Sequence, residues 1–162
     1  MSRRKFLAAG TLAVGGVVAA AGFHITRSDE SRQLVIERQT LPIKGLAPSL
    51  EGFRLALLSD FHLYPFTQPD FVREAVALTN SLQPDLTVLT GDYVWHEVDA
   101  IFDLAPILAG LNARHGVFAV MGNHDLWTDV NIVKKGFDEA RLPYLINQGV
   151  PISQGEGNLY LA

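Results

Sequence analysis

The sequence has 162 residues, a length that corresponds to about one domain. Hydrophobic residues make up 48% and charged residues 19% of the chain, which is typical of a globular protein and excludes a disordered chain or a membrane bundle. The formal net charge of −4 gives no basic surface of the kind that nucleic-acid binding requires, so nucleic acid is not expected as an obligate partner. The sequence contains no cysteine, which excludes disulfides and leaves oxygen and imidazole groups as ligands for any metal ion.

The first thirty residues are predicted to form a separate segment, an export signal or membrane anchor with its linker. Three basic residues at 3–5 precede an uncharged run at 6–23 that is rich in glycine and alanine. This order is typical of an export signal, in which the alanines at 19–21 would form the cleavage site. The run is also close to the length that spans a bilayer, so an uncleaved membrane anchor is the alternative. Cleavage is favoured because the run is poor in leucine.

The start of this segment, SRRKFL, resembles a twin-arginine signal. It departs from the fullest form of that signal at Ala8, where a lysine is common. The resemblance implies export of an already folded protein, which suits a protein that loads metal in the cytoplasm. We therefore expect this protein in the periplasm or on the outer face of the cytoplasmic membrane or wall.

The rest of the chain, residues 31–162, is predicted to form one α/β domain. A short strand is expected at 34–38, before a loop that contains prolines and glycines. Buried strands are expected where the sequence is apolar on both faces of an extended chain, at 53–60, 85–92 and 116–125.

Helical patterns follow these three strands. Helices are predicted where apolar residues recur at helical spacing, at 68–83, 98–111 and 128–142. Pro69 falls in the first turn of the first helix, and Pro106 is expected to kink the second helix or to begin it afresh. Thr128 or Asp129 is the expected N-cap of the third. Alternation of strand and helix predicts parallel βαβ units, whose strands end at one edge of the sheet, where open α/β sheets bind ligands.

Metal-ligating side chains stand at the end of each predicted strand. They are Asp60 and His62 after the first strand, Asp92 after the second, and Asn123, His124 and Asp125 after the third. Two ions about 3.5–4 Å apart need a shared oxygen ligand to offset their repulsion, and Asp92 is the expected bridge. Asp60 and His62, two positions apart on an extended segment, are expected to bind one ion together. Asn123 is expected to supply an amide oxygen to the second ion.

The other two polar residues of the third strand end are assigned to proton transfer. His124 is then free to act as an acid toward the leaving group, and Asp125 is expected to hold its imidazole ring in one tautomer. No substrate-binding residue is assigned.

The three motifs differ in specificity. Asp60 and His62 alone would more often form a surface loop or helix cap, and the Gly91–Asp92 pair would more often form a turn. A turn alone seldom produces Gly-Asn-His-Asp, residues 122–125. The three motifs in this order, each after a strand, therefore favour a functional site.

This constellation resembles the calcineurin-like metallophosphoesterases. The stretches LLSDFHL, TGDYV and MGNHDLW, together with the twin-arginine start, are most similar to an exported bacterial branch that includes phosphodiesterases. The resemblance implies a four-layer α/β/β/α sandwich, of which this chain would form the N-terminal half, and a site that holds two divalent metal ions. It implies hydrolysis of a phosphomonoester or phosphodiester, including lipid- or cell-envelope-derived esters, by a hydroxide that bridges the metals. Oxygen-rich ligation favours Mn or Fe, with Zn as the alternative.

The family pattern continues with a further histidine and a Gly-His-x-His stretch, and neither occurs before Ala162. We therefore expect a C-terminally incomplete domain whose second sheet is absent, leaving one apolar face of the first sheet uncovered. Two alternatives to a hydrolase follow. One is a truncated, catalytically incompetent remnant that binds metal or phosphate, and the other is an interaction module with vestigial motifs.

Overall fold

The computed structural model describes residues 33–162, and the predicted export signal or anchor at 1–30 lies outside them. Contacts divide the chain into a unit that ends at Thr40 and a unit from Leu41 to Ala162. The strand predicted at 34–38 is wrong: this stretch has no regular structure, and Val35 is 76% exposed. No strand of the described residues pairs with this stretch, so its β-branched residues gain nothing there from an extended conformation. Within the described residues, no helix is both long and apolar enough to span a membrane.

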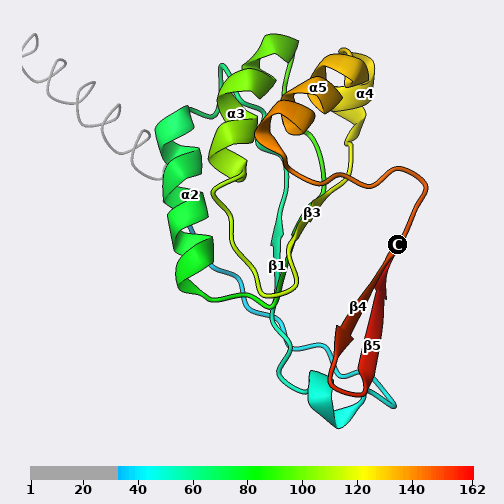
Figure 1. Ribbon diagram of the computed structural model, residues 1–162. Coiled ribbons are helices and arrows are strands. Elements are labelled where there is room, and N and C mark those ends of the chain that lie inside the picture. The colour runs from blue at the N-terminus through cyan, green and yellow to red at the C-terminus, as the bar shows by residue number, and fades with distance from the viewer. Residues whose placement is uncertain (1–32) are drawn as a thin grey trace, which may run out of the picture. The chain divides into compact units, whose positions relative to one another are not determined.

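A three-stranded parallel sheet lies at the centre of the second unit (Figure 1). Its order is β1 (Leu55–Leu58), β2 (Leu86–Leu89) and β3 (Val117–Ala119). Leu55 pairs with Leu86, and Thr87 pairs with Val117. The predicted α/β class and the parallel arrangement are confirmed, because the three apolar runs form the three strands.

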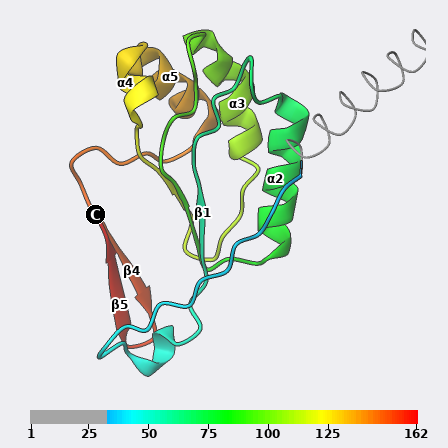
Figure 2. The same cartoon turned by 180° about the vertical axis from the view of Figure 1, so that it is seen from behind.

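Helices cover one face of this sheet (Figures 1 and 2). They are α2 (Pro69–Ser81), α3 (Ile101–Leu108) and α5 (Val130–Ala140). Helix α3 packs against both of the others, and its Leu104 and Leu108 share one core with Leu89 of β2 and Phe137 of α5. This core fixes the strands whose ends carry the polar motifs.

The helix boundaries refine the sequence prediction. The second predicted helix divides into a 3₁₀ turn, η2 (Val98–Ala100), and α3, which contains Pro106 near its end. Asp129 caps α5 by accepting a hydrogen bond from the backbone N–H of Asn131 at 3.0 Å. The hydroxyl of Thr128 instead donates to the carbonyl of His124 at 2.9 Å. This bond closes a short helix that was not predicted, α4 (Asn123–Trp127).

An antiparallel hairpin, β4 (Val150–Gln154) and β5 (Gly157–Leu161), was also not predicted. Ile152 of β4 is 4% exposed and packs with Leu86 and Val88 of β2, on the sheet face away from the helices. The expectation that nothing covers this face is therefore wrong at β2. Leu55 and Leu57 of β1 remain 55% and 63% exposed.

A short turn, η1 (Pro48–Leu50), holds the end of the hairpin. The side chain of Gln154 donates to the carbonyl of Ser49 at 2.6 Å, and the Ser49 hydroxyl accepts from the backbone N–H of Gly157 at 3.0 Å. These bonds join segments more than a hundred residues apart in sequence and orient the hairpin toward the sheet.

Candidate metal centre

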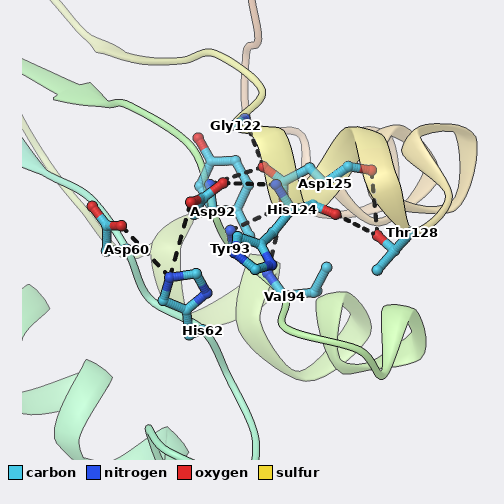
Figure 3. A network of polar contacts seen from close by, with 9 residues as sticks. All are labelled: Asp60, His62, Asp92, Tyr93, Val94, Gly122, His124, Asp125 and Thr128. Atoms are coloured by element: carbon cyan, nitrogen blue, oxygen red, sulfur yellow. Dashed lines mark hydrogen bonds and ion pairs between the residues drawn. The ribbon is translucent and has the colours of Figure 1, made fainter.

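The three strand ends meet at one edge of the sheet, as predicted (Figure 3). The Nε2 atom of His62 lies 3.5 Å from Oδ1 of Asp60 and 3.9 Å from Oδ2 of Asp92. Ligand atoms of His62, Asp92 and His124 all lie within 4.8 Å of one another. We call these four residues, Asp60, His62, Asp92 and His124, the polar cluster.

The backbone brings these side chains together by left-handed turns, and the extended segment predicted for Asp60 and His62 is absent. Asp60, His62 and Asp92 have φ angles of 56°, 41° and 58°. Non-glycine residues adopt this conformation at a cost of roughly 1–3 kcal/mol each, and such residues gather at functional sites. The backbone N–H of His62 donates to the carbonyl of Asp92 at 3.0 Å, which fastens the first two strand ends together.

Two glycines allow the second and third strand ends to approach. A Cβ atom on Gly91 would overlap the backbone of Gly122, and a Cβ on Gly122 would overlap the backbone N and carboxylate of Asp92. Gly91 also has a φ of 101°, which side chains disfavour. Glycine is therefore required at both positions for Asp92 to reach its place in the polar cluster.

Asp125 has a different role from the one predicted. Its carboxylate is fully buried and, within residues 33–162, accepts only backbone hydrogen bonds, from Asp92 N at 2.9 Å, Gly122 N at 2.8 Å, Tyr93 N at 2.9 Å and Val94 N at 3.4 Å. Burial raises the pKa of the Asp125 carboxyl, and the four N–H groups oppose that rise. Asp125 thus joins the loop after β2 to the start of α4, and its oxygens are directed at these amides instead of the His124 ring.

Aromatic rings hold the His124 imidazole. It stacks on Trp95 with centroids 4.3 Å apart and an interplanar angle of 26°, and Trp127 lies 5.0 Å away. The backbone N–H of His124 donates to Oδ1 of Asp92 at 3.0 Å. Trp95 also meets the His62 ring edge-on at 5.0 Å. Sequence reasoning missed Trp95, whose only signal was its position three residues after Asp92.

The remaining sequence candidate, Asn123, and the neighbouring Tyr93 lie in different surroundings. Asn123 begins α4 and is exposed, and its side chain makes no hydrogen bond within residues 33–162. Tyr93 is fully buried and its hydroxyl lies 2.9 Å from the carbonyl of Val120, so it belongs to the core and not to the mouth of the site. Burial raises the pKa of Tyr93 well above its usual value.

The donor set of the polar cluster fits a divalent cation. Carboxylate and imidazole groups without thiolate suit hard or borderline ions such as Mn, Fe and Zn. Among the described residues, no lysine or arginine forms an ion pair with Asp60 or Asp92. Two carboxylates within 4 Å of one imidazole nitrogen, with no cationic side chain paired to them, favour binding of a metal ion at the cluster.

Residues 53–160 match the model of the family described as calcineurin-like phosphoesterase. The chain belongs to this family. The phosphoesterase match spans all three strand ends and β4 and ends within β5, so the resemblance inferred from the motifs is confirmed at the level of the family.

Curated relatives of this phosphoesterase chain include three informative bacterial proteins. It is 31% identical over 134 residues to the uncharacterized metallophosphoesterase YkuE of Bacillus subtilis. These residues cover 77% of this chain and 45% of that protein. It is 39% identical over 83 residues to UDP-2,3-diacylglucosamine pyrophosphatase LpxG of Chlamydia muridarum, covering 51% of this chain and 25% of the relative. It is 27% identical over 157 residues to phosphodiesterase YaeI of Escherichia coli, covering 94% and 56% respectively.

The phosphoesterase chain thus spans about half the length, or less, of these relatives. One of these relatives is named as a phosphodiesterase and another as a pyrophosphatase. Divalent metals are typical of the family, and the polar cluster offers a candidate site for them.

Proposed function

We propose that this protein is a metal-dependent hydrolase of phosphoesters and that the polar cluster belongs to its active site. The observation that carries the proposal is the convergence of His62, Asp92 and His124 from three separate strand ends, with ligand atoms within 4.8 Å of one another. Two left-handed strand-end turns and the close approach of Gly91 to Gly122 bring them there, which is costly for a loop without a function.

Four side chains would hold two divalent ions, Mn or Fe by preference and Zn as the alternative. Asp60 and His62 would bind one ion, Asp92 would contact both, and Asn123 would complete the second set. When bound, the ions would neutralise phosphate charge and lower the pKa of water toward about 7, as in other two-metal hydrolases. The protein's own part is to place these donors without a competing cationic side chain.

His124 is proposed as the group that protonates the leaving oxygen. Its ring lies beside His62 at 4.7 Å and between two indoles, so its orientation is restricted without a carboxylate partner. A positioned acid contributes roughly 10²–10⁴-fold to such reactions. Asp125 acts indirectly, by fixing the backbone on either side of Asp92 and His124.

The substrate class and location of the phosphoesterase are further proposals. A relative named for a diacylglucosamine substrate supports a lipid- or cell-envelope-derived phosphoester. The basic and apolar pattern of residues 3–23 supports export, with the cleaved signal favoured over an anchor. The alternative function is metal or phosphate binding without turnover, which the same three convergent side chains would support.

The decisive experiment measures metal content and turnover on the same preparation of the full chain. Mn, Fe or Zn is added, bound metal is counted, and hydrolysis of bis(p-nitrophenyl) phosphate and p-nitrophenyl phosphate is followed. Asp92→Asn removes the proposed shared ligand, and Asp70→Asn, an exposed carboxylate in α2, is the matched control. The hydrolase is supported if the native chain and Asp70→Asn bind about two ions per chain and hydrolyse the substrates, whereas Asp92→Asn does neither. Bound metal without turnover supports the binding remnant, and no bound metal overturns both.

A further inference from the structure

An exposed apolar surface adjoins the polar cluster. We call it the apolar rim, and its members are Phe66, Trp95, Leu126 and Trp127. Phe66, Leu126 and Trp127 are 70%, 60% and 74% exposed. They come from three different segments: the loop after β1, the loop after β2 and helix α4.

The rim is continuous with the polar cluster through ring contacts. Phe66 meets Trp95 edge-on with centroids 5.4 Å apart, Trp95 stacks on His124, and His124 in turn contacts Trp127 at 5.0 Å. Because ligand atoms of His124, His62 and Asp92 lie within 4.8 Å of one another, a ligand bound at the cluster adjoins the rim.

Packing does not account for these side chains. None of the four belongs to either hydrophobic core of the described chain. Exposed aromatic residues that gather beside a polar site are a usual feature of ligand pockets, in which apolar walls surround a few polar groups.

We propose that the apolar rim binds the alkyl or acyl chain of an amphiphilic phosphoester while the phosphate lies at the polar cluster. The inference rests on the proposed function and assigns its substrate specificity to residues that are not proposed as metal ligands or as the acid. The ring geometry favours a flexible chain over a planar group. Phe66 stands at 82° to Trp95 and Trp127 at 61° to His124, so neither exposed ring is parallel to the stacked Trp95–His124 pair. Leu126, next to Trp127 in α4, adds an exposed aliphatic group.

The test uses substrates that share one leaving group. Methyl, butyl and octyl esters of p-nitrophenyl phosphate are compared with the full chain and Mn, below their micellar concentrations. KM is expected to fall with chain length, by at most about fourfold for each methylene that becomes fully buried, while kcat stays level. Phe66→Ala and Trp127→Ala are both expected to flatten this dependence. Phe66→Ala, which has no ring contact to His124, is expected to leave the methyl ester's KM within about twofold.

Tyr160→Ala is the matched control, because Tyr160 is a 69% exposed aromatic residue of β5 without a ring contact to the rim. All three replaced side chains are exposed, so circular dichroism is expected to show an unchanged fold. A KM that does not depend on chain length in an active protein overturns the inference and leaves the proposed function intact. A phenyl ester that binds more tightly than the octyl ester also overturns it, in favour of a planar ligand.

A second readout is independent of turnover. The chain has two tryptophans, Trp95 and Trp127, and both contact His124. In a Trp95→Phe variant the emission reports Trp127 alone, and octylphosphonate is expected to shield it from acrylamide quenching whereas methylphosphonate is not. If the methyl ester is not hydrolysed, the proposed function fails and this readout alone decides the inference. Shielding of Trp127 before any ligand is added means that another segment or copy covers the rim, which overturns it.

Discussion

The carboxylate of Asp125 accepts a hydrogen bond from the backbone N–H of Asp92 at 2.9 Å, although the two residues are 33 positions apart. Three further N–H groups, of Tyr93, Val94 and Gly122, donate to the same carboxylate. Asp125, which follows the proposed acid His124 in sequence, thus serves as a structural bridge between two strand ends.

Asp125→Asn is expected to lower the free energy of unfolding by about 2–3 kcal/mol. The amide nitrogen would face N–H groups that now donate to a carboxylate oxygen, and hydrogen bonds to a charged group contribute about 1.5–3 kcal/mol each. Urea unfolding measures the change, with Asp103→Asn, an exposed carboxylate at the start of α3, as the control. A variant of unchanged stability that loses turnover alone would restore the predicted role of Asp125 as a partner of the His124 ring.

Gly122→Ala is expected to abolish metal binding at the polar cluster. Gly122 has a φ of −91°, which alanine adopts freely, so the effect arises only from the overlap of the new Cβ with Asp92. Bound metal per chain is the measurement. Gly110→Ala is the control, because its Cβ would meet only Ile107 O at 3.1 Å and Val76 Cγ1 at 3.6 Å. Full metal content in Gly122→Ala would contradict the close approach described for the second and third strand ends.

The contrast between these residues shows what the sequence could predict. The buried strand β2 was predictable because Leu86, Val88 and Leu89 place apolar side chains on both faces of an extended segment, as in the central strand of a parallel sheet. The meeting of Asp60, Asp92 and His124 followed from parallel topology, which places successive strand ends at one edge. Left-handed turns at Asp60 and His62 were not predictable, since neither residue is glycine and the conformation depends on bonds to the loop after β2.

Other features depend on contacts between distant segments. Asp125 was paired with His124 because they are adjacent in sequence, whereas most of its partners lie about thirty positions earlier. The five residues of α4 are too few to show a helical period. The hairpin did carry a signal, alternating apolar residues at 150, 152, 159 and 161 around a glycine turn, but its place depends on Ser49.

Thr87→Val is expected to raise the free energy of unfolding by about 1 kcal/mol. Thr87 is fully buried in β2, and its hydroxyl has no hydrogen-bond partner within residues 33–162. Valine has nearly the same shape and removes the cost of burying an unpaired polar group. Thr79→Val is the opposite case. The Thr79 hydroxyl donates to Ala75 O at 2.8 Å, and loss of this hydrogen bond is expected to lower the free energy of unfolding. Urea unfolding that shows equal changes for the two variants would contradict this account.

Tyr93 is expected to make stability fall at alkaline pH. Its folded pKa is raised by burial above the unfolded value of about 10, so the folded state keeps a proton that the unfolded state loses. The contribution of the Tyr93 hydroxyl to the free energy of unfolding is fully present below a pH of about 10. Above that pH it falls by up to about 1.4 kcal/mol per pH unit. Tyr93→Phe lacks the hydroxyl bond to Val120 and is expected to be about 1 kcal/mol less stable at neutral pH. The two stability curves should therefore cross about one unit above pH 10, and parallel curves would disprove the assignment.

Trp95 is expected to affect metal affinity without being a ligand. Its indole stacks on His124 and meets His62 edge-on, so it restricts both imidazole rings of the polar cluster. Trp95→Ala frees these rings and is expected to weaken Mn binding by roughly tenfold, the lower end of the range for groups that orient metal ligands. Trp95→Phe keeps a ring in contact and is expected to stay within about threefold of the native affinity. Calorimetric titration with Mn separates the two, and an alanine variant that binds as tightly as the native protein would show that the rings are held by other contacts.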